Sequence, residues 1–167
     1  WNILSLTKTI DVDILGTDVS FGFDSAVSIA TDAIDRLHST ASSHKRVMVI
    51  EVRGHKAGWI ALYSGMAGGG DVILIPELSY NIHNIGDTIL NRLKKGKPYS
   101  IVVVAEGIQT DGKKRAAEYI AQEIEYETGI ETRDTVLGYI QRGGSPTPFD
   151  RNLSTRMGVH ATELIAG

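Results

Sequence analysis

Two aspartates near the start of the chain, Asp11 and Asp13, have the residue type and the spacing for acid–base chemistry. They follow an apolar stretch over residues 3–6 and precede a glycine-bearing turn over residues 15–18. This pattern predicts a strand that runs into a loop, which would place both carboxylates where open α/β sheets bind their ligands. One carboxylate could accept the proton of a hydroxyl nucleophile while the second faces a cation or holds the loop, as phosphoryl transfer to an alcohol requires. In isolation, such a pair more often forms a turn or a cap.

The composition of the chain restricts the kind of protein that it can be. Its 167 residues correspond to one domain or slightly more, and 42% of them are hydrophobic, which is enough for a substantial core. A net charge of −3 gives no electrostatic footprint for nucleic acid. There is no cysteine, so disulfides and thiolate metal sites are excluded. No apolar run reaches the roughly 18 residues of a membrane span and no signal peptide is visible, so we expect a cytoplasmic protein without membrane contacts.

Helical and strand-like patterns alternate along the chain. Apolar residues recur at helical spacing over residues 24–37, 58–66, 85–95, 113–126 and 151–164. Short Val- and Ile-rich runs predict strands at residues 47–52, 72–75, 101–104 and 135–137. Ser20 or Asp24 is expected to cap the first helix and Asp150 the last, and Gly129 is expected to end the fourth. Nearly continuous apolar strands separated by helices predict an α/β fold with a mostly parallel sheet flanked by helices.

Basic residues and glycines follow several of the predicted strands. Residues 53–55 (Arg-Gly-His), 106–107 (Glu-Gly) and 141–146 (Gln-Arg-Gly-Gly-Ser-Pro) each come directly after a strand. Arginines can grip a phosphate in a bidentate manner, and glycine permits close backbone approach, so this edge of the sheet suits an anionic ligand. Arg46 and Arg133 precede their strands and would lie at the opposite edge. Any one of these arginines alone could equally be a solvated surface residue.

Together these residues resemble the phosphofructokinase family. The matching segments include Lys8-Thr9-Ile10-Asp11-x-Asp13, Phe21-Gly22-Phe23-Asp24, Ser42-Ser43-His44-x-Arg46, Glu131-Thr132-Arg133 and Gln141-Arg142-Gly143-Gly144-Ser145-Pro146. The resemblance extends in order over essentially the whole chain. It implies a 6-phosphofructokinase, a glycolytic kinase that transfers a phosphoryl group to the 1-hydroxyl of fructose 6-phosphate and gives fructose 1,6-bisphosphate. The cofactors that it implies are Mg²⁺ and a phosphoryl donor, either ATP or pyrophosphate.

The resemblance also implies roles for individual residues. Asp11 would be the base that activates the 1-hydroxyl, with Thr9 and Asp13 arranging the site around it. No metal ligand is implied with certainty, and Asp13 would reach a metal at most indirectly. The residues implied in binding the substrate are Thr9, Ile10, Arg46, Arg53, Gly54, His55, Glu106, Arg133, Tyr139, Gln141 and Arg142. Arg142 would hold the 6-phosphate, and Arg46 and Arg133 would reach it from a neighbouring subunit of a homo-oligomer, either a dimer or a tetramer.

Four positions depart from the family pattern. Val12 stands where asparagine is usual, Arg53 replaces a methionine, His55 often appears as arginine and Tyr139 stands where histidine is common. Arg53 could offset part of the charge missing at His55, or it could point away from the site. Residues 38 and 71 fall where many bacterial members bind an allosteric nucleotide, but His38 replaces an arginine there, so regulation is not expected.

The chain resembles only the second half of the sequences of family members. Family members carry a glycine-rich donor-phosphate region upstream of the Asp11 motif, and this sequence does not contain it. We expect residues 1–22 to be a strip of the donor domain, residues 23–140 to bind fructose 6-phosphate and residues 141–167 to return into the donor domain. The isolated chain is expected to be inactive. Lys8 is typical of pyrophosphate-dependent members and of a related ATP-dependent branch, so the donor stays open. Two alternatives are a fragment that only binds sugar phosphate and a regulatory paralogue.

Overall fold

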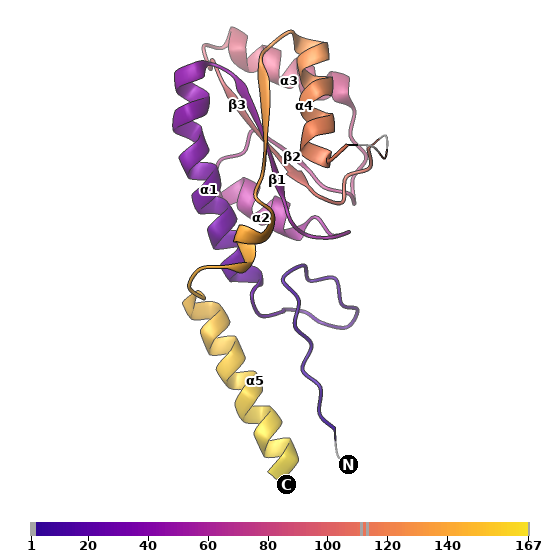
Figure 1. Ribbon diagram of the computed structural model, residues 1–167, viewed down its shortest axis with the longest axis vertical. Coiled ribbons are helices and arrows are strands. Elements are labelled where there is room, and N and C mark those ends of the chain that lie inside the picture. Colours follow the sequence, from indigo (N-terminus) through magenta and orange to yellow (C-terminus); the bar gives the residue numbers. More distant parts are fainter. Residues whose placement is uncertain (1–2, 111, 113, 167) are drawn as a thin grey trace.

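A parallel sheet forms the centre of the molecule. The computed structural model describes residues 3–110, 112 and 114–166. Within these residues four strands lie in the order β2-β3-β1-β4, and all three pairings are parallel. The strands are β1 (Val47–Val52), β2 (Val72–Leu74), β3 (Ser100–Ala105) and β4 (Thr132–Val136). The predicted α/β class with a parallel sheet is confirmed (Figure 1).

Helices cover both faces of this sheet. They are α1 (Phe23–His44), α2 (Trp59–Ala67), α3 (Ile82–Lys94) and α4 (Ala116–Thr128). Successive side chains of a strand point to opposite faces. Met48 and Ile50 of β1 therefore pack in a core with residues of α1 and α2, whereas Val47 and Val49 pack in a second core with residues of α3 and α4. Double-sided burial explains why β1 and β3 read as continuous apolar runs rather than as alternating ones.

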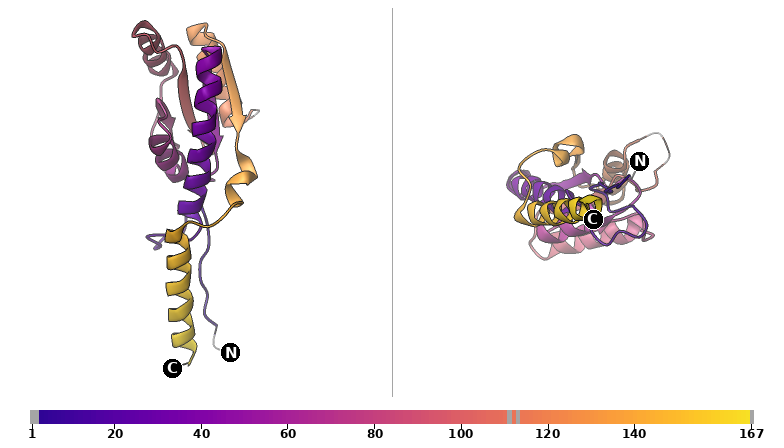
Figure 2. Two further views of the ribbon diagram at one scale, coloured as in Figure 1. Left: turned by 90° about the vertical axis from the view of Figure 1, so that its left-hand side faces the viewer. Right: turned by 90° about the horizontal axis from the view of Figure 1, so that it is seen from below.

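The last helix and the first residues extend away from the sheet. After β4 the chain forms a short 3-10 helix, η1 (Gly138–Arg142), and then α5 (Pro148–Ala166). Both α5 and the amino-terminal segment project from the same end of the domain (Figure 2). Several apolar side chains on them are exposed, among them Ile3, Leu15 and Ile165. No helix among the described residues is both long enough and apolar enough to span a bilayer.

The strand predicted before Asp11 is not formed. Residues 3–9 have no regular secondary structure, and the described sheet consists only of β1 to β4. A strand is defined by the neighbour that pairs with its backbone N–H and C=O groups. Because none of the described strands pairs with residues 3–9, the apolar pattern there produces an extended segment rather than a strand.

The capping predictions for the first and last helices were wrong. The amino-terminal cap of α1 is Gly22, and neither Ser20 nor Asp24 caps it with a side chain. Instead the Asp150 carboxylate, from the first turn of α5, accepts hydrogen bonds from the backbone N–H of Gly22 (2.9 Å) and of Ser25 (2.8 Å). Asp150 thus caps the first helix from a position 125 residues beyond Ser25. This long-range contact ties the base of α5 to the start of α1.

The remaining boundaries lie close to the predicted ones. The helix predicted from residue 113 begins at Ala116, and Gly129 ends it in the left-handed region, as expected, with φ 68°. β4 begins at Thr132, so Arg133 is the second residue of the strand rather than a residue before it.

Candidate functional site

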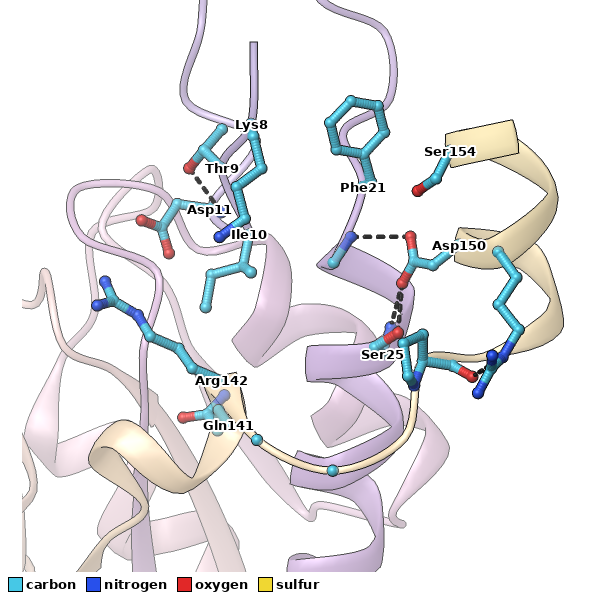
Figure 3. A pocket seen from close by; sticks show the side chains of 15 residues that line it. Lys8, Thr9, Ile10, Asp11, Phe21, Ser25, Gln141, Arg142, Asp150 and Ser154 are labelled. Atoms are coloured by element: carbon cyan, nitrogen blue, oxygen red, sulfur yellow. Dashed lines mark hydrogen bonds between the residues drawn. The ribbon is translucent and has the colours of Figure 1, made fainter. Parts of the chain in front are cut away.

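The loop that carries both aspartates is held by Thr9. The Thr9 hydroxyl accepts a hydrogen bond from the Asp11 backbone N–H (3.1 Å) and donates one to Asp13 Oδ1 (3.1 Å). Between the aspartates, Val12 has φ 54°, in the left-handed region that branched side chains rarely adopt. Asp11 Oδ1 is buried and has no hydrogen-bond partner among the described residues. Asp11 therefore has one carboxylate oxygen whose hydrogen-bonding capacity is unused among the described residues, and Figure 3 shows this carboxyl group at the cavity.

The pKa of Asp11 lies above its ordinary value. The largest cause is desolvation, because burial disfavours the charged carboxylate, and the negative charges of Asp13 and Glu106 add to it. The guanidiniums of Arg53 and Arg142 act in the opposite direction and lower the same pKa in part. In Figure 3 the Arg142 side chain rises from the end of η1 toward the Asp11 carboxyl group. Asp11 thus stands among both acidic and basic groups.

The carboxyl ends of β1 and β3 are joined through Glu106. Its Oε1 accepts hydrogen bonds from the backbone N–H of His55 (2.6 Å) and of Gly54 (3.3 Å), and its Oε2 lies 3.7 Å from Arg53 Nη1. A Cβ on Gly54 would lie 2.3 Å from the Ala57 carbonyl oxygen, so only glycine fits there. The Glu106 carboxylate therefore fixes the backbone of the segment that follows β1.

His55 links this segment to the aspartate loop. Its Nδ1 lies 3.4 Å from Asp13 Oδ2, and its backbone has φ 53°. Asp13 thus contacts the imidazole of His55, and Glu106 accepts a hydrogen bond from the backbone N–H of the same residue. The ends of β1 and β3 and the loop before α1 accordingly form one surface.

The segment after β4 completes this surface. The buried Gln141 side chain accepts a hydrogen bond from the Arg53 backbone N–H at 2.8 Å. The exposed ring of Tyr139 lies 4.9 Å from the guanidinium carbon of Arg53 and 5.4 Å from that of Arg142, measured to the ring centroid. The Arg53 guanidinium therefore lies on this surface, beside Tyr139. The sequence had left open whether the Arg53 side chain would face the site or point away from it.

Two cavities open on this surface. One of about 600 Å³ lies between the aspartate loop, the start of α1, residues 141–146 and α5, and Lys8, Asp11 and Arg142 line it. The other, of about 380 Å³, is lined by residues that include Arg53, Glu106 and Tyr139. The first is the cavity drawn in Figure 3. The structure thus brings together the predicted site residues Lys8, Thr9, Ile10, Asp11, Asp13, Arg53, Gly54, His55, Glu106, Tyr139, Gln141 and Arg142. Of these, the Ile10 side chain is buried in the core.

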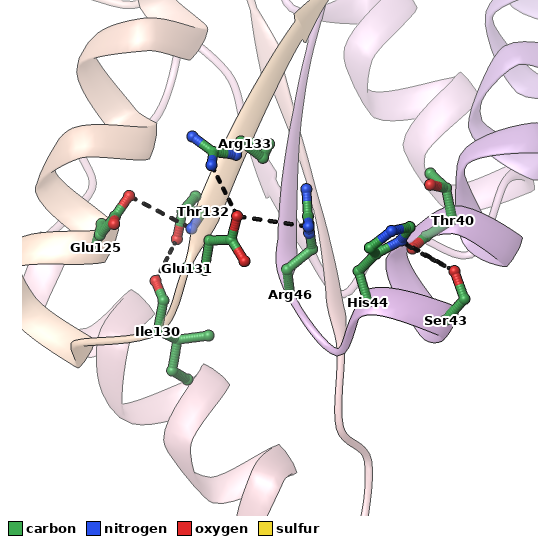
Figure 4. Close-up of polar contacts among 9 residues, drawn as sticks. All are labelled: Thr40, Ser43, His44, Arg46, Glu125, Ile130, Glu131, Thr132 and Arg133. Carbon is green, nitrogen blue, oxygen red and sulfur yellow. Dashed lines mark hydrogen bonds and ion pairs between the residues drawn. The ribbon is translucent and has the colours of Figure 1, made fainter.

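Arg46 and Arg133 lie at the other edge of the sheet. Both contact one oxygen of Glu131, at 3.4 Å from Arg46 Nη2 and 2.8 Å from Arg133 Nη2 (Figure 4). Arg46 precedes β1 and Arg133 is near the start of β4, whereas Glu106 and Arg142 follow β3 and β4. Within one chain, these two arginines are therefore not brought to Asp11.

Some residues of the site were missed in the sequence. Asp150, Ser25 and Arg151 line the larger cavity, and Glu51 and Arg115 line the smaller one. Glu51 carried a signal, since it is a charged residue inside an otherwise apolar strand. It is buried, and its Oε2 accepts a hydrogen bond from the backbone N–H of Ala117 in the first turn of α4 (2.9 Å). Asp150 was predicted as the cap of the last helix, and no role in the site was predicted for Asp150 or Arg151.

The residues at the effector position have partners of their own. His38 Nε2 lies 2.7 Å from the Gly68 carbonyl oxygen, and its Nδ1 lies 3.3 Å from the Tyr99 hydroxyl. Asp71 pairs with Arg92 at 2.7 Å and accepts a hydrogen bond from the Ile101 backbone N–H at 2.9 Å. His38 thus links α1 to Gly68 at the carboxyl end of α2, and Asp71 links Arg92 of α3 to the backbone of β3.

The acidic residues of the site suit a cation only in part. In the described ranges, no group of three or more histidine, aspartate or glutamate side chains is arranged to hold a metal ion. Mg²⁺, however, commonly binds through one or two carboxylates together with waters and substrate phosphates. The unpartnered Asp11 oxygen and the neighbouring Asp13 carboxylate match that limited donor set.

Known proteins resemble this chain over nearly its full length. The family model for phosphofructokinase matches residues 1–165. The chain is 90% identical to ATP-dependent 6-phosphofructokinase 3 of Bacteroides thetaiotaomicron over 165 residues, which are 99% of the chain and 49% of that protein. It is 56% identical to the ATP-dependent 6-phosphofructokinase of Spirochaeta thermophila, covering 98% of the chain and 50% of that protein. The chain therefore spans about half the length of the curated relatives that it matches.

Solved structures show the same likeness. Phosphofructokinase from Saccharomyces cerevisiae superposes with a TM-score of 0.86 at 34% identity, covering 95% of this chain and 22% of that one. The pyrophosphate-dependent phosphofructokinase from Nitrosospira multiformis gives a TM-score of 0.82 at 28% identity, covering 95% of this chain and 43% of that one.

Proposed function

Because the chain belongs to the phosphofructokinase family, we propose that it carries the sugar-phosphate half of an enzyme that phosphorylates the 1-hydroxyl of fructose 6-phosphate. The product is fructose 1,6-bisphosphate, and the reaction is a step of glycolysis. The observation that carries this proposal is the state of Asp11, which combines a raised pKa with a buried oxygen that has no partner among the described residues. A carboxylate in that state is suited to accept a proton.

Asp11 acts as the general base of the proposed reaction. The Asp11 carboxylate takes the proton of the 1-hydroxyl while the hydroxyl oxygen attacks the terminal phosphorus of the donor. The bond from that phosphorus to the bridging oxygen of the donor breaks, and the remainder of the donor leaves with the electron pair. The raised pKa brings the base closer to the working pH, which makes proton transfer more effective. Thr9 and Asp13 hold the loop in place through their hydrogen bond. Since phosphoryl transfer depends mostly on positioning and charge stabilisation, a fixed loop is the main requirement.

The groups after β1, β3 and β4 bind the sugar phosphate. Glu106 fixes the backbone of Gly54 and His55, and this segment lines the sugar. Arg142 holds the 6-phosphate, because a guanidinium matches a phosphate with two parallel hydrogen bonds. Arg46 and Arg133 of a second subunit complete the phosphate site, so the active protein is a homo-oligomer. Their position at the far edge of the sheet supports an action in trans.

The proposed phosphoryl donor is ATP. Relatives at 90% and 56% identity are named ATP-dependent, whereas a pyrophosphate-dependent structure matches at only 28%. Lys8 lines the larger cavity beside Asp11, where it faces the donor side. Mg²⁺, held through Asp13 and water and by the donor phosphates, would neutralise charge on the transferring group. Residues 1–22 and 141–167 then belong to the donor side and residues 23–140 to the sugar-phosphate domain.

The test is turnover by the full-length protein that contains this chain. We expect fructose 1,6-bisphosphate to form from fructose 6-phosphate, Mg²⁺ and ATP, with little or no reaction when pyrophosphate replaces ATP. A reversed donor preference would overturn the ATP assignment alone. Tight binding of fructose 6-phosphate without turnover by either donor would instead support the alternative of a regulatory paralogue. The chain of 167 residues by itself is expected to be inactive, and turnover by it would contradict its role as one half of the site.

A further inference from the structure

Two departures from the family pattern, Arg53 and Tyr139, lie against each other and against Arg142. The guanidinium carbons of Arg53 and Arg142 are 4.9 Å and 5.4 Å from the centroid of the Tyr139 ring. Arg53 comes from the segment after β1, whereas Tyr139 and Arg142 come from η1 after β4. The Tyr139 ring therefore contacts the guanidiniums of Arg53, which follows β1, and of Arg142, which follows β4.

Two guanidiniums at one place repel each other unless something offsets their charge. The face of an aromatic ring carries negative electrostatic potential and attracts a cation within about 6 Å of its centroid. Tyr139 offers this attraction to both arginines. Tyr139 is 74% exposed, so the ring contributes little to the core.

Both arginines retain unused hydrogen-bonding capacity. Arg53 Nε is buried and has no partner among the described residues, and the contact of Arg53 with Glu106 is long for an ion pair at 3.7 Å. Within the described ranges, no carboxylate lies within 4.0 Å of the Arg142 guanidinium nitrogens. A pair of incompletely satisfied guanidiniums beside a cavity is suited to a dianion such as a phosphate monoester.

We propose that Tyr139 is a positioning residue that holds Arg53 and Arg142 together, so that both guanidiniums bind the phosphate of the sugar phosphate. This inference rests on the proposed function and adds to it a second cation, Arg53, at a position where the family pattern has none. Arg53 and Tyr139 line the smaller cavity together with Glu106, whereas Arg142 lines the larger cavity together with Asp11. Because the Tyr139 ring contacts both arginines, it lies where the two cavities adjoin, and the presence of Glu106 favours the sugar phosphate over the donor. Arg53 and Tyr139 then act as one unit.

The test is a double-mutant cycle in the full-length protein, with the affinity for fructose 6-phosphate measured by calorimetry. We expect Arg53→Met and Tyr139→Leu each to weaken binding roughly three- to thirtyfold, the range of a cation–aromatic contact together with the interaction that it positions. The double variant should bind about as weakly as the weaker single variant, because each change removes the same arrangement. Tyr139→Phe, which keeps the ring, should bind like the unmodified protein.

Controls separate this role from a structural one. Tyr126→Leu removes a tyrosine on α4 that is even more exposed than Tyr139, and Arg36→Met removes an exposed arginine on α1; both should leave binding unchanged. In steady-state kinetics, the KM for fructose 6-phosphate should rise in Tyr139→Leu while kcat and the KM for ATP stay nearly constant. A change confined to the KM for ATP would mean that the pair serves the donor and would overturn the inference.

The outcomes also distinguish this inference from the proposed function. If the unmodified protein binds fructose 6-phosphate and Arg142→Ser abolishes that binding, the proposed site stands. Tyr139→Leu binding as tightly as the unmodified protein, or single effects that simply add in the double variant, would then overturn only the role of Tyr139. No binding of fructose 6-phosphate by the unmodified protein would overturn both.

Discussion

Asp11 is placed where function and stability oppose each other. Its pKa is raised, first by burial and then by the charges of Asp13 and Glu106, so the folded protein disfavours the ionised form that a general base must have. Because the folded pKa exceeds the unfolded one, this unfavourable contribution is absent at low pH and develops as the pH rises through the two values.

Replacement of Asp11 by asparagine should therefore raise stability and abolish activity. The neutral amide removes the cost of the buried charge, and we expect a higher melting temperature than in the unmodified protein at pH 7 but not near pH 3. In the full-length protein, kcat should fall by roughly two to four orders of magnitude, the usual contribution of a positioned base. The KM for the sugar should change much less. A variant that mainly loses sugar affinity would show that Asp11 is a binding contact rather than the base.

Val12 stores strain in the same loop. Its φ of 54° places a β-branched residue in the left-handed region, which costs an L-residue about 1–2 kcal/mol. Glycine adopts this region freely, so Val12→Gly should raise the free energy of unfolding by about 1 kcal/mol despite the greater freedom of glycine in the unfolded chain. Val19→Gly, at an exposed position of ordinary φ, is the matched control and should be neutral or destabilising. Chemical denaturation measures both, and a loss of stability in Val12→Gly would exclude the strain.

Much of the residue-scale chemistry was readable in the sequence, and part of it was not. The placement of Glu106 and Arg142 near one another was predictable from the strands that precede them, whereas Asp11 was identified from its motif alone. The direction of Arg53 was not predictable, because it depends on the ring of Tyr139, which lies 86 positions further along the chain (139 − 53). Contacts between side chains on different elements become visible only when the elements are placed.

At the scale of elements, burial on both faces made the sheet predictable. Nearly every residue of β1 and β3 is buried and apolar, so the sequence shows nearly continuous runs of Val and Ile, with Glu51 and Ser100 as the exceptions. Capping of α1 was not predictable, since its cap comes from Asp150 in α5 rather than from a neighbouring residue. The absence of a strand at residues 3–9 was not predictable either, because an apolar segment forms a strand only when a neighbouring strand pairs with it.

The Asp150 cap should make a measurable contribution to stability. Asp150→Ala removes the carboxylate that accepts hydrogen bonds from the partly buried backbone N–H groups of Gly22 and Ser25 at the start of α1, so we expect a loss of about 1–2 kcal/mol. Asp35→Ala, an exposed aspartate within α1, should change stability by less than about 0.5 kcal/mol. Urea unfolding of the two variants checks this. Equal effects would mean that Asp150 does not cap α1.

His83 should make the packing of α3 against α4 depend on pH. Its Nδ1 lies 2.5 Å from Glu127 Oε1 on α4, and its Nε2 lies 3.7 Å from Asp87 Oδ2 on α3. The hydrogen bond with Glu127 raises the pKa of His83 most, followed by the charges of Asp87 and Glu127. The stabilisation is therefore fully present below the ordinary histidine pKa of about 6.5 and is lost as the pH rises through the raised value.

The variant His83→Gln tests this dependence. Its melting temperature should fall below that of the unmodified protein at about pH 5.5, and the difference should shrink as the pH rises through the raised pKa of His83. His160→Gln, at an exposed histidine of α5, provides the reference for an unrelated imidazole. A difference that is constant over this pH range would show that His83 contributes through packing alone.

At the scale of the whole molecule, the arginines of the proposed phosphate site lie at opposite edges of one sheet. Arg142 follows β4, whereas Arg133 is near its start and shares Glu131 with Arg46. Side chains at the two opposite ends of the strands in a parallel sheet cannot contact one ligand within the same domain. If all these arginines hold one phosphate, then Arg46 and Arg133 must come from another copy, and each charged contact is worth about 1.5–3 kcal/mol. Loss of either should therefore weaken sugar-phosphate affinity roughly ten- to a hundredfold.

A shared site makes the most direct measurement a complementation experiment. Full-length subunits carrying Arg133→Ser are mixed with subunits carrying Asp11→Ala, and fructose 1,6-bisphosphate formation is measured in hybrids whose composition is established by native mass spectrometry. Each parent alone should be nearly inactive. The hybrids should recover activity, because some of their sites combine an intact Asp11 from one subunit with an intact Arg133 from the other. Hybrids that form but stay as inactive as the parents would show that Arg133 serves its own subunit or no site, and the account of a site completed by two chains would be wrong.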